Sequence, residues 1–179
     1  MTKPAQRIAS RSRLLSPSLA ALGVVFLAGT AQAQTSASAD AKAQIQTPIV
    51  LTKRADLDFG RFAADNLATG TVTIDAADGS RSSTVVIEAG GAPAAARFEA
   101  IGIANFNYTI ALGSPPTLTH TLDNTKTMIV SSLTLDGPVN RTFPANRIGD
   151  IQVGGTLDVG VDQAEGDYEG DFTIDVNFL

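Results

Sequence analysis

The last residues of the chain alternate between apolar and polar side chains. From residue 166 to residue 179, the apolar positions on one side of an extended backbone are Tyr168, Phe172, Ile174, Val176 and Phe178. The positions between them are mostly acidic or polar. A period of two is typical of a half-buried β-strand and does not match a helix. The pattern predicts a strand over residues 166–179 that closes the fold. Because a terminal strand frays unless a sheet holds it, we expect this strand in the core of its sheet.

Shorter alternating runs divide the rest of the chain, and turn residues such as Asp78-Gly79 separate them. The expected strands are residues 47–53, 56–60, 70–75, 83–89, 97–103, 106–112, 117–122, 127–135 and 151–161. Residues 140–149 are expected to form a loop, and the pair Gly154-Gly155 indicates a bulge or a close backbone approach. Nine or ten short strands without a helical stretch predict an all-β domain over residues 47–179. An immunoglobulin-like antiparallel β-sandwich is the first interpretation and a jelly roll is the alternative.

The first 33 residues have the order of a secretory signal peptide. A basic start containing Lys3, Arg7, Arg11 and Arg13 precedes a short apolar run at 19–28, and Ala31-Gln32-Ala33 forms a small-x-small cleavage site. We therefore expect cleavage between Ala33 and Gln34. The apolar run is too short for a membrane span, so the mature chain is expected to be exported without one.

Residues 34–46 form an N-terminal extension with two open interpretations. Its composition, rich in Ala, Ser and polar residues, is typical of a flexible linker. Its pattern is that of a strand with small side chains, in which every second residue is apolar: Ala37, Ala39, Ala41, Ala43 and Ile45.

The net charge and the cysteine content limit which partners and which sources of stability this protein can have. Cleavage at residue 33 removes four of the 13 basic residues and none of the 18 acidic residues, which leaves a net charge of −9. Nucleic acids and anionic membranes require a basic surface, so neither is an expected partner. The chain has no cysteine, and therefore its stability must come from core burial and strand pairing.

The titratable residues do not form a catalytic pattern. His120 is the single histidine and there is no cysteine, so neither a zinc site nor a histidine-based triad is expected. Carboxylates cluster after residue 157, but their spacing does not match a calcium-binding loop, and Glu169, Asp171 and Asp175 are explained as the solvated face of the last strand. We therefore expect no enzyme activity, no cofactor and no metal site.

The closing stretch resembles the subunits of chaperone–usher pili. Those pilins carry a glycine fourteen residues from the end, then alternating apolar residues and a penultimate aromatic residue, usually Tyr. Here Gly166 is fourteenth from the end and Phe178 is penultimate. More widely, the chain is similar to a bacterial family of secreted, pilin-like domains of unknown function. The segments that carry this similarity are residues 48–53, 56–60, 70–74, 153–157 and 166–170.

The resemblance implies a mechanism and a set of partners. A pilin is an immunoglobulin-like sandwich that lacks its final strand; a periplasmic chaperone first lends a strand, and the N-terminal extension of the next subunit then replaces it at an outer-membrane usher. The resemblance assigns the subunit and chaperone interface to Gly166, Tyr168, Phe172, Ile174, Val176 and Phe178. It assigns the donor strand to Ala37, Ala39, Ala41, Ala43 and Ile45. It implies a route through the periplasm to a fimbria on the cell surface.

Three features depart from the pilin pattern. Phe178 stands where Tyr is usual, the disulfide of many pilins is absent, and the alternating residues of the extension are mostly alanine. A monomeric extracytoplasmic domain that binds glycan or calcium is therefore the alternative function.

Overall fold

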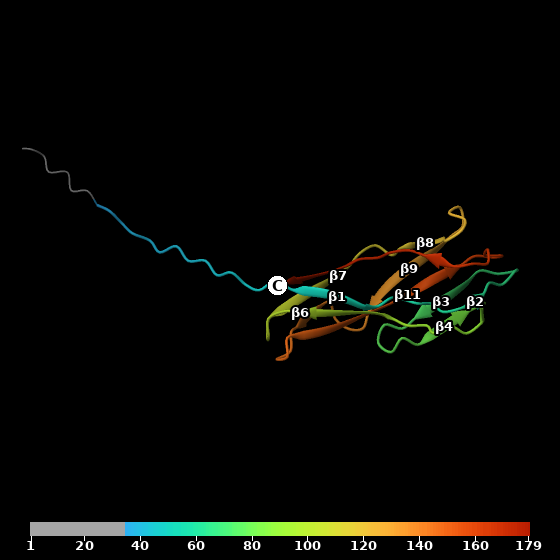
Figure 1. Cartoon of the computed structure of the whole chain (residues 1–179), viewed down its shortest axis with the longest axis horizontal. Helices are drawn as coiled ribbons and strands as arrows, with labels where there is room; N and C mark the ends of the chain where they lie inside the picture. Colours follow the sequence, from blue (N-terminus) through green and yellow to red (C-terminus); the bar gives the residue numbers. More distant parts are fainter. Residues whose placement is uncertain (1–34) are drawn as a thin grey trace, which may run out of the picture. The chain divides into compact units, whose positions relative to one another are not determined.

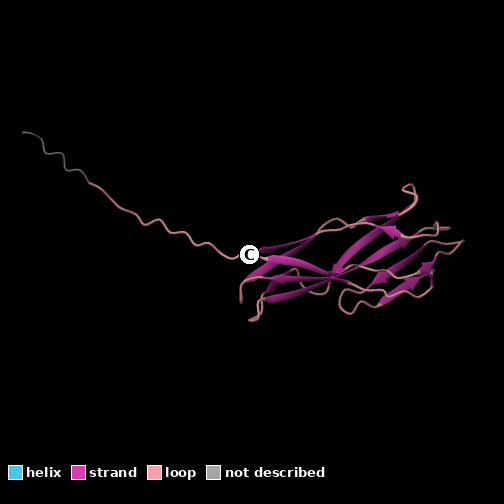
Figure 2. Cartoon of the chain, viewed as in Figure 1, coloured by secondary structure: helices cyan, strands magenta, loops and turns pink. Residues whose placement is uncertain are grey.

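The computed structural model describes residues 35–179, and every regular element in that range is a β-strand (Figures 1 and 2). The signal peptide expected over residues 1–33 lies outside the described residues. The strands are β1 (Val50–Ala55), β2 (Phe62–Ala63), β3 (Gly70–Ile74), β4 (Arg81–Thr84), β5 (Ile87–Glu88), β6 (Ala96–Ile101), β7 (Asn107–Leu112), β8 (Thr117–His120), β9 (Thr127–Leu135), β10 (Asn140–Thr142), β11 (Ile148–Val159), β12 (Tyr168–Glu169) and β13 (Ile174–Phe178).

The larger sheet is built on β11, and all its pairs are antiparallel. Its strand order is β1-β6-β11-β9-β8-β12. Residues 148–153 of β11 pair with β6, whereas residues 155–159 pair with β3, which in turn pairs with β4. Gly154 lies at this change of partner, where an added Cβ would stand 2.2 Å from the carbonyl oxygen of Ile74. The close backbone approach that Gly154-Gly155 predicted is therefore confirmed.

The smaller sheet has the order β10-β7-β13, with β7 at its centre. Its apolar side chains pack on one half of the larger sheet. The shared core contains Tyr108, Ile110, Phe143 and Ile174, together with Ala96, Ala100, Ile151 and Val153 of β6 and β11. The ring of Tyr108 stacks on that of Phe143 at a centroid distance of 4.1 Å. The two sheets thus form the expected β-sandwich.

The strand order is that of an immunoglobulin sandwich, in which strands A, B, E and D form one sheet and C, F and G the other. In chain order, β1, β6, β7, β9, β11 and β13 occupy the places of A to F. The order β1-β6-β11-β9 then corresponds to A-B-E-D, and the pair β7-β13 corresponds to C-F. Strand G would pair with the other edge of β13. Among residues 35–179, no strand occupies that place.

A second core lies beyond the smaller sheet. Val72, Ile74, Val130, Leu157 and Val159 of the larger sheet are at most 2% exposed. Their partners on the open side are irregular segments and short strands: Leu57, Phe59, Phe62, Ala64 and Tyr168. Half of the large sheet is therefore covered by single chain segments instead of a second sheet.

The C-terminal segment differs from its prediction. Instead of one strand over residues 166–179, it forms β12 at the edge of the larger sheet and β13 at the edge of the smaller one. Neither lies in the core of its sheet, so the expected position was wrong. The chain pairs with β8 up to Glu169 and with β7 from Ile174 onward.

Three further segments differ from their predictions. Residues 56–60 do not form a strand, and within them only Asp58 makes an isolated bridge, with Ala94. Residues 140–149 are not a simple loop, because β10 pairs with β7 and β11 begins at Ile148. Residues 83–89 are divided between β4 and β5 at Val85, whose φ of 61° interrupts the extended backbone.

Candidate functional site

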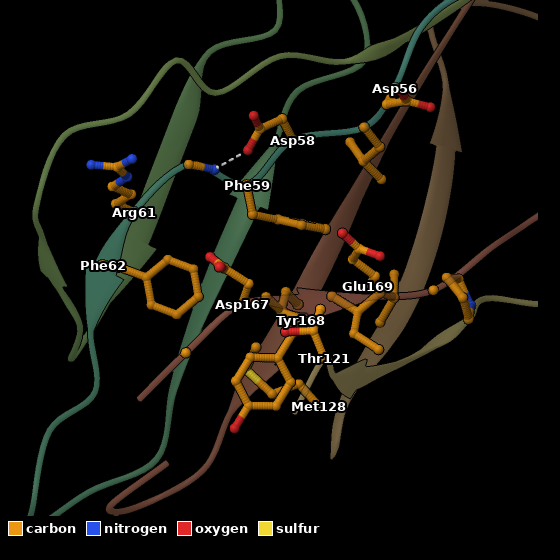
Figure 3. Close-up of a pocket in the computed structure, with 18 of the residues that line it drawn as sticks. Asp56, Asp58, Phe59, Arg61, Phe62, Thr121, Met128, Asp167, Tyr168 and Glu169 are labelled. Carbon is orange, nitrogen blue, oxygen red and sulfur yellow. Dashed lines mark hydrogen bonds between the residues drawn. The ribbon is translucent and has the colours of Figure 1, made fainter. Parts of the chain in front are cut away.

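An open groove of about 1640 Å³ lies over the half of the larger sheet that single chain segments cover (Figure 3). One side is formed by residues 53–64, called here the N-terminal wall, and the other by residues 162–172, the C-terminal wall. The floor is mainly apolar and comes from four strands of the larger sheet: Ala96, Phe98, Leu118, Met128, Val130 and Leu157. The groove exceeds the roughly 300–1,000 Å³ of a typical small-molecule pocket. A volume of this size can hold a segment of polypeptide.

Arg81 stabilises the N-terminal wall by binding its backbone carbonyl groups. Its guanidinium Nη1 donates hydrogen bonds to the carbonyl oxygens of Phe59, Arg61 and Gly90 at 3.3, 3.2 and 3.1 Å. Its Nη2 pairs with the Glu88 carboxylate at 3.0 Å. With these contacts in place, the Phe59 ring turns into the groove and is only 8% exposed (Figure 3).

Tyr168 and His120 hold the C-terminal wall. The Tyr168 hydroxyl donates to the carbonyl of Ala164 at 2.8 Å and accepts from the Gln163 amide at 2.8 Å. The His120 ring packs edge-on against Tyr168 at a centroid distance of 5.0 Å. His120 also bonds the carbonyl of Glu165 at 2.9 Å. His120 thus joins the end of β8 to the C-terminal wall.

Two strands of the sandwich keep an unpaired edge, and one of them, β1, contributes Lys53 and Ala55 to the groove. β13 pairs with β7 from Ile174–Leu112 to Phe178–Tyr108, and β1 pairs with β6. Within residues 35–179, neither strand has a partner on its other edge. The exposed N–H and C=O groups of such edges are templates for another strand.

The sequence matches the family described as "Domain of unknown function (DUF4402)" over residues 49–178. The chain belongs to the DUF4402 family. The match runs from the residue before β1 to the last residue of β13, so the DUF4402 domain comprises the sandwich, both walls and the floor. No curated protein and no solved structure matches the sequence. In the part of the chain that the structure describes, no helix is long and apolar enough to cross a membrane.

The six predicted interface residues lie in two different places in the DUF4402 domain. Gly166, Tyr168 and Phe172 line the groove. On β13, Ile174 is buried while Val176 and Phe178 are half-buried, and these three side chains belong to the core shared by the two sheets. The two groups meet at Phe172, whose ring contacts Phe98 of the floor edge-on at 6.2 Å. The six residues therefore follow one border of the sandwich without forming one strand.

The five candidate donor residues lie outside the sandwich strands. The structure assigns no strand to residues 35–49, and the side chains of Ala37, Ala39, Ala41 and Ala43 are exposed. Ile45 is 98% exposed. The expected alternation is present in the sequence, but in the single chain it is not part of a sheet.

The rim of the groove is acidic. Carboxylates of both walls outnumber the cations Lys53 and Arg61, and Figure 3 shows Asp167 and Glu169 turned toward the segment that bears Phe59. The pKa of Lys53 is raised, chiefly by its 2.6 Å hydrogen bond with Asp56 and further by Asp171 on the opposite wall. No set of three or more His, Asp or Glu residues among residues 35–179 is arranged to hold a metal ion.

Sequence reasoning did not find the N-terminal wall. The alternation around Phe59 indicated a short strand, but nothing in it identified residues 162–172 as the opposite side of a groove. Arg81 was also missed, since its three carbonyl partners come from loops that only the fold brings together.

Proposed function

We propose that this protein is a non-enzymatic structural subunit of a cell-surface fibre, in which each subunit accepts a β-strand from another molecule. The observation that carries the proposal is the empty place beside β13, where strand G of an immunoglobulin sandwich would pair. A groove with an apolar floor lies next along the chain, and its lining ends at Phe172, two residues before β13 begins.

Addition of a strand would pair the free strand edge and cover the groove floor. The backbone of an incoming strand pairs with a free edge, and every second side chain fills the space over the floor. A free edge beside an apolar groove favours aggregation, so a secreted subunit needs a strand from a chaperone until the next subunit supplies one. A head-to-tail contact of this kind does not close, and repetition produces a fibre.

The N-terminal extension has the properties of the donor. Twelve extended residues, 35–46, span about 40 Å. Alanine side chains are small, but Val130 and Leu157 of the floor are already only 1% exposed, so a donor strand has little of their surface left to cover. The alternation of Ala37 to Ile45 places apolar groups on one face of such a strand.

The test is deletion of residues 34–46 in the protein exported by its native machinery. We expect the full mature chain to form fibres in electron micrographs and a ladder on an unboiled denaturing gel, and the deletion to remove both. Ala41→Asp places a charge on the face expected to enter the groove and should weaken the ladder. Ser38→Asp places the same charge on the opposite face and is the matched control.

Stable monomers from both the full chain and the deletion would contradict the proposal. The sheet would then be complete in itself, and a monomeric binding domain would be the better interpretation.

A further inference from the structure

His120 occupies the end of β8, directly behind the C-terminal wall. Its Nδ1 accepts hydrogen bonds from the backbone N–H groups of Leu122 and Asp123, each at 3.0 Å. An atom that accepts two hydrogen bonds carries no hydrogen, so the hydrogen of the neutral ring is on Nε2. Nε2 therefore donates to the carbonyl of Glu165 at 2.9 Å. One ring joins the β8–β9 turn to the wall.

The wall fits closely around this ring. At Gly166, an added Cβ would stand 2.0 Å from Nε2 of His120. The Tyr168 ring packs edge-on against the imidazole. Next to the ring, Thr121 donates its N–H to the carbonyl of Asp167 at 2.8 Å. A rotation of the imidazole would therefore disturb the wall from Glu165 to Tyr168.

Protonation removes the lone pair on which this arrangement depends. An imidazolium carries hydrogen on both nitrogens and accepts no hydrogen bond. Its Nδ1–H would face the N–H groups of Leu122 and Asp123, donor against donor. To avoid this contact the ring must turn or the β8–β9 turn must open. His120 is half-buried, so solvent protons reach it.

The carboxylates around the ring attract the charged imidazolium, and their side chains are exposed. The β8–β9 turn carries Asp123 and Lys126, and the wall carries Asp162, Glu165, Asp167 and Glu169. The pKa of Asp123 is lowered, mainly by hydrogen bonds from Thr125 and to a small extent by His120. Solvent screens exposed charges, whereas the two amide contacts are direct.

We propose that His120 is an acid-sensitive latch on the C-terminal wall of the groove. In its neutral form it holds residues 165–168 against the end of β8, and protonation releases them and loosens one side of the groove. The latch is a property of this wall; its effect on strand exchange rests on the proposed function.

The first experiment observes the latch in the mature chain by nuclear magnetic resonance. Because His120 is the single histidine, its ring signals are unambiguous. At neutral pH we expect hydrogen on Nε2. As the ring takes up its proton, hydrogen-exchange protection at Thr121, Leu122 and Asp123 should fall by up to about tenfold per pH unit, after correction for intrinsic exchange. Protection at Val130, in β9, should not follow the titration. A ring with hydrogen on Nδ1, or a titration without this loss of protection, would overturn the latch.

Two variants distinguish the effect of the His120 ring from the effect of a nearby carboxylate. In His120→Asn, the amide oxygen replaces Nδ1 as the acceptor for residues 122 and 123 and carries no titratable proton. Protection there should become independent of pH. In Glu165→Gln, the carbonyl that the ring contacts is unchanged, so the pH dependence should remain. If it disappears in Glu165→Gln and persists in His120→Asn, a carboxylate is the sensor and the latch is wrong.

A synthetic peptide of residues 35–46 connects the latch to the groove. We expect its dissociation from the chain lacking residues 34–46 to be faster at pH 5 than at pH 7, and equal at both in His120→Asn. If the amides respond to pH but the peptide never binds, the latch stands and the proposed function fails. If the peptide binds but the amides do not respond, the proposed function stands and the latch fails.

Discussion

Replacement of Gly154 by alanine tests the junction on which the larger sheet depends. The added Cβ would lie 2.2 Å from the carbonyl oxygen of Ile74 and 2.6 Å from the N atom of Ala76, where ordinary contacts begin at 3.4 Å. Both neighbours are backbone atoms, so no side-chain rotation relieves the contact and β3 must move away from β11. Overpacking of a core costs typically 1–3 kcal/mol, and a backbone contact belongs at the upper end, about 3 kcal/mol.

Urea and thermal unfolding of the mature chain measure this effect. For a domain of this size, a loss of about 3 kcal/mol lowers Tm by roughly 10 °C. Gly137→Ala is the matched control, because its Cβ would meet nothing closer than the Arg141 guanidinium at 3.6 Å. That variant should stay within about 0.5 kcal/mol of the parent. If Gly154→Ala also stays within that range, β3 and β11 are not as close as the structure places them, and the position of the groove floor is wrong.

Three further predictions concern Gly166 in the C-terminal wall, Tyr108 in the core shared by the two sheets, and the contact of Phe172 with the groove floor. Gly166→Ala imposes a φ of 136° on alanine beside His120 and should lower the free energy of unfolding by about 1–3 kcal/mol, whereas Gly160→Ala should change it less. Burial raises the pKa of Tyr108 above its usual 10.0. The folded state therefore favours the neutral phenol, and this stabilisation is complete below the unfolded pKa and lost as pH rises through the folded value. A fall in stability above about pH 10, seen by urea unfolding and absent in Tyr108→Phe, would verify this. Phe172→Ala removes a half-buried ring from its contact with Phe98 and should cost about 1–2 kcal/mol, part of the 3–5 kcal/mol of a fully buried phenylalanine; an unchanged urea midpoint would contradict that contact.

Strands with a clear period of two were predictable from the sequence. The run 127–135 coincides with β9, and its burial alternates from Met128 to Val130 as the pattern requires. β3 and β7 were found within one residue of their observed bounds. Local patterns succeed there because one face of each strand meets a core and the other meets solvent.

The candidate site was predictable only in part. Gly166, Tyr168 and Phe172 were identified through the C-terminal pattern, and they line the groove. The same pattern did not reveal the change of sheet between β12 and β13. Side-chain alternation reports which face is buried, and it continues unchanged when the backbone moves from one partner strand to another.

The sequence by itself determined the all-β class, the position of several strands and the close approach at Gly154. These depend on local backbone preferences and on the order of polar and apolar residues. Only the tertiary structure decided that residues 53–64 face residues 162–172, that Arg81 and His120 support the two walls, and that β13 keeps a free edge. These features arise from pairings between residues far apart in the chain. Many strand orders bury the same apolar faces, and the order is selected by the packing of the whole core.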